Sequence, residues 1–528
     1  MLEVKNVSLK FGTKTLFENV NLKFQDGECY GLIGANGAGK STFLKILSKE
    51  LETTTGEVYL EKNKRLSFLR QDHYMYDEET VINTVLRGNK KLWDIIEEKN
   101  KLYSQTEFSD EDGVRLAELE GEFLDLDGWS AESNAATLLN NLGVDSELHY
   151  SLMKDIPVKL RVKVMLAQAL FDDPDVLLLD EPTNSLDNKA ISWLEEFLIN
   201  YKNTVIVVSH DRHFLNKVCT YIADIDYGKI KLYVGNYDFW YESSQLLIKQ
   251  IKEQNKKKEE KIKELQAFIA RFSANASKSK QATSRKKLLD SIELETLTPS
   301  SRKYPFIEFK MENSHGKEIL TVGKLTKKIG DKVLLDKVSF TVNQNDKILI
   351  VSDDDTKKTA LFNILMGLDR DYHGEVIWGK TIIPSYLPQD NSKYFENKDK
   401  NIMEWIGENY DIKDETILRG FLGRMLFSHD DVFKKVGVLS GGEKARCMLS
   451  RMMLSSPNFL ILDEPTNHLD LESITSLNKG LEKFDGEIIF TSRDHELNST
   501  VANRIIYIGE DGKITDRYIT YDEYLENN

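Results

Sequence analysis

The sequence has no long apolar run and few cysteines. No stretch approaches the roughly 18–20 uncharged apolar residues that a membrane-spanning helix requires. The three cysteines, Cys29, Cys219 and Cys447, lie far apart and form no CxxC pair, which argues against a disulfide framework, a zinc ribbon or an iron–sulfur cluster. The first residues, MLEVKNVSLKFG, lack the basic region and apolar run of a secretory signal. We therefore expect a cytoplasmic protein with no membrane partner.

The chain is long and acidic overall. Its 528 residues are 40% hydrophobic, which is enough apolar material for several cores, and the length predicts about three to five structural units. The formal net charge of −15 argues against a uniformly basic nucleic-acid-binding protein. Residues 249–290 nevertheless hold 13 Lys/Arg and 5 Asp/Glu, a net charge of +8. The sequence thus predicts acidic domains joined by a basic segment.

The sequence repeats itself. The segment from Leu2 recurs in outline from Leu320, and DVLLLDEPTNSLD, from Asp175, recurs as NFLILDEPTNHLD, from Asn458. Equivalent positions are 318 residues apart in the first segment and 283 apart in the second, so the first copy carries about 35 extra residues. These lie near residues 88–128. A helical spacing there predicts a helical hairpin, with apolar residues at Leu116, Leu119, Phe123 and Leu126.

A long helix is predicted between the two copies, from Tyr241 to Phe272, with Ile262, Leu265 and Ile269 on one face. A polar tip and a second helix through Leu288, Leu289 and Ile292 would follow. The tip concentrates five basic residues, which are Lys278, Lys280, Arg285, Lys286 and Lys287. A solvated spacer is the alternative, but a spacer does not need its charge gathered at the turn. We expect domains at 1–240 and 306–528, with a basic helical linker at 241–305.

A phosphate-binding loop is predicted at Gly34 to Ser41. GANGAGKS fits G-x-x-x-x-G-K-[ST] between the apolar run CYGLI and the helical run TFLKIL. The glycines let backbone N–H groups face phosphate oxygens, and the helix N-terminus adds a favourable dipole. Lys40 would bind the β- and γ-phosphates and Ser41 the Mg²⁺. The candidate nucleotide contacts are Gly34, Asn36, Gly37, Gly39, Lys40, Ser41 and Thr42.

Acidic residues follow a second apolar strand. Asp180 ends the run VLLLD and is suited to Mg²⁺ coordination, while the adjacent Glu181 is suited to polarising the attacking water. Two such acids are often a solvated turn, but the repeated DEPTN-x-LD context favours a site. His210 is a candidate γ-phosphate contact and Gln71 a candidate metal and water contact. Phe11 is a candidate for stacking on adenine; a structural histidine and a core aromatic are the alternatives for His210 and Phe11.

The motifs resemble a known family. LSGGEKARCML, from Leu439, together with both DEPTN-x-LD stretches resembles the ABC ATPase superfamily, whose signature loop reads LSGGE. Two such domains without a membrane span, joined by a long basic helix pair, are similar to the ABC-F translation-factor family, and FIARFSANASKSKQATSRKK resembles its bacterial YbiT/YkpA-like branch. The resemblance covers nearly the whole chain. It implies an α/β fold with two tandem P-loop ABC-type ATPase domains, a long antiparallel helical hairpin linker and a helical arm inserted in the first domain.

The resemblance implies two composite ATP sites, each made by the phosphate loop of one domain and the signature loop of the other. Site one has every expected element. These are Lys40, Ser41, Gln71, Asp180, Glu181 and His210 from the first domain, with Ser440, Gly441, Gly442 and Glu443 from the second. We therefore expect ATP and Mg²⁺ to bind there.

Site two departs from the pattern. Its phosphate loop, SDDDTKKT, keeps Lys358 and Thr359 but has no glycine, and its three aspartates would repel a nucleotide. Three further positions also differ: Ile329 replaces the adenine-stacking aromatic, Arg493 stands at the position of His210, and IPVKLRVKV, from Ile156, has neither serine nor glycine where the first domain's signature is expected. Gln389, Asp463 and Glu464 persist. We infer one hydrolytic site and one that binds ATP weakly or not at all; two active sites are the alternative.

The ABC-F resemblance implies a partner. Members bind the ribosomal E site and place the interdomain helices against P-site tRNA, so the basic tip would contact rRNA and tRNA phosphates. ATP hydrolysis would then control release, and the paired domains make a monomer sufficient. The alternatives are an ATPase subunit of a membrane transporter, an antibiotic-protection ABC-F factor and a non-hydrolysing scaffold. The short tip favours a housekeeping role over antibiotic protection.

Overall fold

The structure is a computed structural model that describes most of the chain. The described residues are 2–12, 14–35, 37–69, 74–105, 109–184, 186–272, 284, 287–289, 302–311, 316, 318–330, 332–408 and 414–527. The chain divides into two compact units, the first built mainly from residues before 302 and the second mainly from residues 302 onward. The expected domain limits at 240 and 305 stay a prediction.

The central sheet of the first unit is mostly parallel, in the order β5-β6-β7-β3-β8-β9. Its strands are β3 (Cys29–Gly34), β5 (Leu66–Phe68), β6 (Val176–Asp180), β7 (Thr204–Val208), β8 (Tyr221–Asp226) and β9 (Lys229–Val234), of which only β9 is antiparallel to its neighbour. β3, β6 and β7 are buried throughout. Their continuous apolar runs favour this, because a parallel sheet is covered on both faces. The carboxyl ends of these three strands therefore meet at one edge.

A second, antiparallel sheet lies beside the phosphate-loop helix. Its order is β2-β1-β4, with β1 (Leu2–Phe11), β2 (Lys14–Phe24) and β4 (Thr55–Leu60). Phe17 of β2 meets Phe43 of α1 (Lys40–Leu47) edge to face, with ring centroids 5.6 Å apart. Both rings are fully buried in one apolar core. This packing fixes the helix that follows the phosphate loop.

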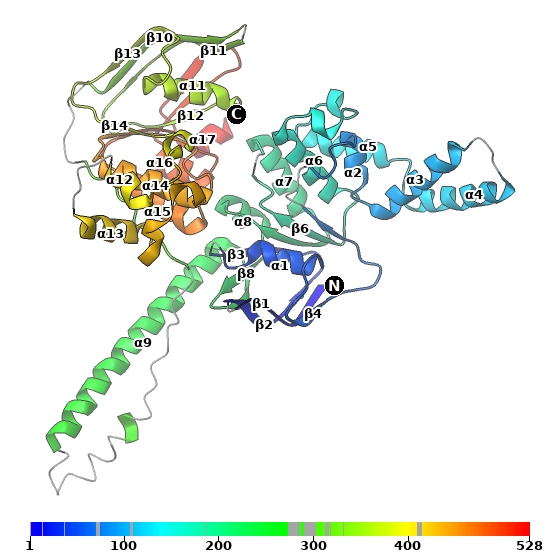
Figure 1. The fold of residues 1–528 in the computed structure, drawn as a ribbon, viewed down its shortest axis with the longest axis horizontal. Helices are drawn as coiled ribbons and strands as arrows, with labels where there is room; N and C mark the ends of the chain where they lie inside the picture. The colour runs from blue at the N-terminus through cyan, green and yellow to red at the C-terminus, as the bar shows by residue number, and fades with distance from the viewer. Residues whose placement is uncertain are drawn as a thin grey trace. The chain divides into compact units, whose positions relative to one another are not determined.

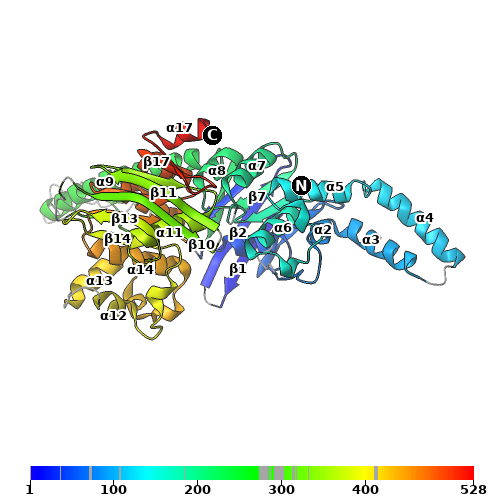
Figure 2. The same ribbon diagram turned by 90° about the horizontal axis from the view of Figure 1, so that it is seen from above.

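The predicted arm in the first domain is confirmed. Helices α3 (Lys90–Tyr103) and α4 (Asp110–Asp125) lie side by side as a hairpin that projects from the first unit (Figure 1, Figure 2). Lys99 of α3 pairs with Glu120 of α4 at 2.8 Å and lies 3.8 Å from the centre of the Phe123 ring. The other short helices of this half are α2 (Val81–Leu86), α5 (Ala131–Asn141), α6 (Val158–Leu170), α7 (Asn188–Ile199) and α8 (Arg212–Val218), with 3-10 turns η1 (Ser146–Leu148) and η2 (Met153–Asp155).

The predicted long helix is α9 (Tyr237–Phe272), the extended helix labelled in Figure 1. It begins four residues earlier than Tyr241 because Asn236 caps it, accepting a 3.1 Å hydrogen bond from the N–H of Phe239. Trp240 anchors this first turn by donating to Asp224 Oδ2 of β8, at 3.2 Å. The predicted tip and second helix lie outside the described residues, except for position 284 and residues 287–289, which are helical.

The second unit repeats the arrangement. Its mostly parallel sheet has the order β14-β15-β16-β12-β17-β18, and its antiparallel sheet the order β11-β10-β13. The strands are β10 (Leu320–Ile329), β11 (Lys332–Val342), β12 (Lys347–Val351), β13 (His373–Trp378), β14 (Pro384–Leu387), β15 (Phe459–Asp463), β16 (Glu487–Thr491), β17 (Arg504–Ile508) and β18 (Ile514–Arg517). The expected pair of α/β domains is therefore confirmed.

The helices of the second unit are interspersed with these strands. They are α11 (Asp355–Leu365), α12 (Ile402–Gly407), α13 (Glu415–Arg424), α14 (Gly441–Leu454), α15 (Leu471–Glu482), α16 (His495–Val501) and α17 (Tyr521–Glu526), with 3-10 turns η3 (Ser392–Phe395), η4 (His429–Phe433) and η5 (Val436–Val438). Figure 2 shows α11 beside the curved sheet of β10, β11 and β13. In the first unit, α1 shares an apolar core with β1, β2 and β4 (Figure 1).

Candidate nucleotide site

The first phosphate loop has the backbone that an anion requires. Between β3 and α1, Gly37 and Gly39 have φ of 77° and 104°, which a residue with a Cβ rarely adopts. Gly39 is the N-cap of α1 and makes no side-chain cap, so the N–H groups of the first turn stay available to a ligand. Nζ of Lys40 donates to the carbonyl oxygen of Gly34, at 2.8 Å, and lies 3.4 Å from that of Ala35. The ammonium is thus held over the loop.

The proposed metal ligands are brought together. The Ser41 hydroxyl at the start of α1 hydrogen bonds the carboxylate of Asp180, the last residue of β6. Burial raises the pKa of Asp180, and the Ser41 hydrogen bond and the charge of Lys40 act against that rise. These oxygen ligands suit Mg²⁺, which binds few protein groups and completes its octahedron with phosphate and water. The site therefore fits a magnesium–nucleotide complex.

Glu181 and His210 end at the same edge of the sheet. Glu181 follows β6 with φ of 53°, and its N–H donates to the carbonyl of Val208 at 2.9 Å, so the end of β7 holds it in this uncommon conformation. His210 lies two residues beyond β7, after Ser209, whose hydroxyl is 3.4 Å from that of Thr183. The sheet topology places both predicted catalytic residues at the carboxyl ends of neighbouring strands.

Some predicted residues are not described. Asn36 and Gln71 lie outside the described residues. Phe11 is the last residue of β1, and the structure describes only its backbone. Among the predicted RNA contacts, Lys278, Lys280, Arg285 and Lys286 are also outside, while Lys287 is helical and exposed. Their roles remain predictions.

The second phosphate loop is replaced by a turn of helix. At the 318-residue offset, Lys358 corresponds to Lys40, yet α11 begins at Asp355 whereas α1 begins at Lys40. The N-cap is Asp354, whose carboxylate accepts from the N–H of Thr356 at 2.9 Å. An aspartate at that place starts a helix, whereas the glycines of the first copy keep the chain in an open loop.

An ion-pair network surrounds Lys358. Its Nζ lies 2.8 Å from Asp355 Oδ1 and 3.5 Å from Glu464 Oε1, and Arg493 Nη2 lies 3.0 Å from Asp355 Oδ2. Arg493 Nε is also 3.9 Å from Glu464 Oε1. This network was not predicted from the sequence. The three-residue spacing of Asp355 and Lys358 was its signal, because such residues meet on one face of a helix.

The two signature positions differ in how their helices begin. In the second unit, Ser440 caps α14 and forms a reciprocal pair with Glu443, whose carboxylate accepts from the N–H of Ser440 at 2.9 Å. A Cβ on Gly442 would lie 2.8 Å from the carbonyl oxygen of His468, so only glycine fits there. In the first unit α6 begins after Pro157, which makes no side-chain cap. The two helix starts therefore differ in capping as well as in sequence.

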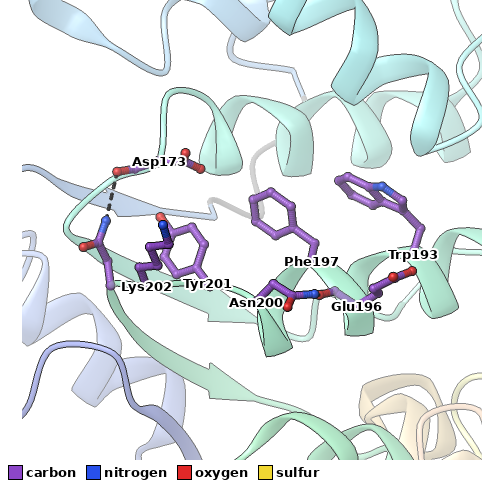
Figure 3. Close-up of a pocket in the computed structure, with 8 residues that line it drawn as sticks. Asp173, Trp193, Glu196, Phe197, Asn200, Tyr201 and Lys202 are labelled. Carbon is purple, nitrogen blue, oxygen red and sulfur yellow. Dashed lines mark hydrogen bonds between the residues drawn. The ribbon is translucent and has the colours of Figure 1, made fainter.

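A groove in the first unit lies away from these residues. It has a volume of about 500 Å³ and is lined by an aromatic row on α7 and by polar residues, namely Asp173, Trp193, Glu196, Phe197, Asn200, Tyr201, Lys202 and Asn203 (Figure 3). Asp173 precedes β6, whereas Asp180 ends it. The groove is therefore at the opposite edge of the sheet from the phosphate loop and contains none of the predicted site residues.

Comparison with known proteins identifies the family of these domains. The sequence profile of the ABC transporter family matches residues 17–184 and 335–467, and a further ABC transporter profile matches residues 223–309. Over 529 residues the chain is 58% identical to the uncharacterized ABC transporter ATP-binding protein YkpA of Bacillus subtilis (strain 168), covering all of this chain and 98% of that protein. It is 44% identical over 528 residues to the probable ATP-binding protein YbiT of Escherichia coli O157:H7, covering 100% and 99%.

More distant similarities extend over the whole chain. ABC transporter F family member 5 of Arabidopsis thaliana is 31% identical over 539 residues, which cover 100% of this chain and 77% of that protein. Among solved structures, the archaeal ribosome recycling factor aABCE1, in complex with the ribosomal stalk protein aP1, has a TM-score of 0.62 at 16% identity, covering 99% and 92%. The last similarity shows the fold.

One further observation bears on the class of protein. No helix in the described ranges is long and apolar enough to cross a membrane. The chain instead contains two copies of one arrangement, with α9 between them. Each copy has the same two sheets and a DEPTN-x-LD stretch after a strand; the first has the glycine-rich phosphate loop and the second has SDDDTKKT in its place. These features and the relatives over its full length show that the chain belongs to the ABC-F family of tandem ABC ATP-binding proteins.

Proposed function

We propose that this protein is an ATPase that binds the ribosome, with one hydrolytic site and one site that does not turn over. The contrast between the two phosphate loops carries the asymmetry. Gly37 and Gly39 keep the first loop open, whereas the second is wound into α11 from Asp355. The composite pairing of Lys40 with the signature residues Ser440, Gly441 and Gly442 is part of this proposal, as are the domain limits 1–240, 241–305 and 306–528.

The proposed chemistry is positioning and electrostatic stabilisation. Lys40, the N–H groups of the first turn of α1 and the signature amides would neutralise charge on the phosphates, and Ser41 and Asp180 would hold the metal. Mg²⁺ supplies charge neutralisation of the nucleotide when it is bound. Glu181 would orient the attacking water, with Gln71 and His210 beside the γ-phosphate, and Phe11 would stack on adenine. ATP bound at site one favours the closed pair of domains, and its hydrolysis releases them.

A ribosomal partner is supported by charge and by family. Residues 249–290 carry a net charge of +8 in a chain of net charge −15. The first part of this segment lies on α9, a helix of 36 residues. The Lys and Arg side chains in the later part of this segment would contact rRNA and P-site tRNA phosphates. The ABC-F relationship supports binding at the E site. The acidic domains would limit indiscriminate binding to RNA.

The test is ribosome co-sedimentation with a hydrolysis-deficient protein. Glu181→Gln protein with ATP should pellet with ribosomes, and with ADP it should not; binding should weaken as salt rises, because phosphate contacts release counterions. Glu464→Gln is the matched control, since Glu464 occupies the equivalent position in the second unit. It should pellet no better than wild type. An ATP-loaded, folded Glu181→Gln protein that stays in the supernatant would contradict the ribosomal role and direct attention to a transporter partner.

A further inference from the structure

The second phosphate loop contains a carboxylate where the first has open space. At the 318-residue offset, Asp355 corresponds to Gly37, and a Cβ built on Gly37 meets nothing within 4 Å. Asp355 instead begins α11, one turn before Lys358, and its carboxylate reaches that lysine at 2.8 Å. The negative group that faces the loop lysine is therefore part of the chain itself.

The ion pairs around Asp355 join equal numbers of cations and carboxylates. Two cations, Lys358 and Arg493, meet two carboxylates, Asp355 and Glu464, through the distances given above. The Lys358 and Glu464 side chains are 9% and 2% exposed. Both carboxylate oxygens of Glu464 are buried and make no hydrogen bond in the described chain, so Lys358 and Arg493 stabilise this carboxylate by charge. In an intact site the nucleotide phosphates bring the negative charge that the loop lysine requires.

We infer that the Asp355 carboxylate substitutes for a nucleotide phosphate at the second site, so that Lys358 and Arg493 are engaged without any ligand. This inference rests on the proposed asymmetry of the two sites and gives its cause. The second unit then holds its loop in one state throughout the ATP cycle, and only site one responds to nucleotide.

A simpler explanation is that three aspartates repel the nucleotide by their combined charge. The three are not equivalent, however. Asp353 lies 3.4 Å from the hydroxyl of Tyr507, and Asp354 pairs with Lys332 at 2.7 Å and caps α11. Of these three aspartates, Asp355 is the one whose carboxylate pairs with Lys358 and Arg493 in the described chain. Asp353→Asn therefore removes the same charge from the same loop and leaves the network intact.

The experiment uses full-length protein in which Lys40→Ala silences site one, and it measures MgATP binding by calorimetry. We expect no measurable binding for Lys40→Ala alone or with Asp353→Asn. Adding Asp355→Asn to Lys40→Ala should produce measurable binding, at least tenfold tighter than the weakest that the calorimeter detects, and a further Lys358→Ala should abolish it. Asp355→Glu, which keeps the carboxylate, should behave like the parent.

Each contrary result has its own meaning. Equal gains from Asp353→Asn and Asp355→Asn would overturn the inference in favour of general repulsion, and no gain from Asp355→Asn would overturn it as well. Binding by Lys40→Ala alone that requires Lys358 would overturn the proposed asymmetry instead. Circular dichroism checks the fold of each variant. If Asp355→Asn is misfolded, Asp355→Gly, which restores the residue type of Gly37, carries the same comparison.

Discussion

The Thr359 hydroxyl donates a 2.8 Å hydrogen bond to Oδ2 of Asp463, although the phosphate loop that precedes it contains no glycine. The pair matches that of Ser41 and Asp180 in the first unit. Asp463 also accepts from the Thr491 hydroxyl at 3.0 Å. The hydrogen bond on the metal side of the second site is thus retained, while on its phosphate side Lys358 pairs with Asp355. The presence of Asp463 at the position equivalent to Asp180 therefore does not by itself indicate that the second site hydrolyses ATP.

Glu181 and Glu464 provide the most direct test of which site turns over. Because Glu181 is proposed to orient the attacking water, Glu181→Gln should lower the steady-state ATPase rate by about 100-fold or more. Glu464 is engaged by Lys358 and Arg493, so Glu464→Gln should leave the rate within about twofold. Phosphate release measures both. A large loss in Glu464→Gln with activity retained in Glu181→Gln would reverse the assignment of the sites.

Gly39 is predicted to be indispensable to nucleotide binding. Alanine at φ of 104° is strained, and its Cβ would lie 3.3 Å from Leu16 Cδ1 and 3.4 Å from Phe17 Cε1. Strain of about 1–2 kcal/mol in the binding conformation corresponds to roughly a tenfold loss of ATP affinity. Fluorescent nucleotide titration would show it.

Gly121 supplies the control for Gly39. It lies within α4, and a Cβ there meets nothing within 4 Å. Gly121→Ala should leave nucleotide affinity unchanged, and it should raise the free energy of unfolding by about 0.5–1 kcal/mol, because alanine loses less backbone entropy on folding. Equal losses of affinity in both variants would rule out the conformational argument.

Arg504 is expected to stabilise the second unit. Its side chain is 5% exposed and pairs with Asp346 at 2.6 Å and with Asp516 at 2.5 Å. Arg504→Ala leaves the buried Asp346 carboxylate without its cation, so it should lower the free energy of unfolding by about 3–5 kcal/mol. Arg419→Ala is the comparison, because the Arg419–Glu415 pair on α13 is about half exposed; it should cost less than about 1 kcal/mol. Urea denaturation distinguishes the two, and similar midpoints would contradict the expectation.

Asp175 should make the stability of the first unit depend on pH. Burial alone would raise its pKa, but the hydrogen bonds from Lys64 and from the N–H of Arg65, both 2.8 Å, outweigh it and lower the pKa. A lowered pKa stabilises the folded state above the unfolded value of about 3.9, and this contribution is lost as the pH falls through the folded value. The stability difference between wild type and Asp175→Asn should therefore be full near pH 7 and shrink below about pH 4. A difference that stays constant down to pH 3 would refute the assignment.

Much of the fold could be predicted because its signals are local. Continuous apolar runs such as VLLLD indicate buried parallel strands, glycine spacing indicates a phosphate loop, and the repeat indicates two domains. The arm was visible as an insertion with helical periodicity. The start of α9 was placed late because its prediction used apolar spacing alone. The cap at Asn236 is a local signal that this spacing does not contain, and the anchor at Trp240 depends on Asp224 in β8.

The second site could be predicted only in part. The loss of glycine is written in the sequence, and so are three aspartates. The sequence does not show which of the three aspartates contacts Lys358. That contact depends on α11 starting one turn early and on Arg493, which is 138 positions away from Asp355 in the chain. Charge repulsion by the three aspartates stays a prediction from the sequence, and the structure adds the specific ion pairs of Asp355 with Lys358 and Arg493.

The anchor of α9 has a mechanical consequence. Trp240 is tied to Asp224, which lies opposite Ile33 in the register of β8 and β3, and Gly34 of the phosphate loop follows Ile33 directly. At about 1.5 Å per residue, the 36 residues of α9 form a lever of about 54 Å. A rotation of about 5° at its root would carry its far end through about 5 Å, which is the pitch of a helical turn. A small movement at the end of β3, which leaves the packed sheet undisturbed, would thus displace the far end of α9 by several ångströms.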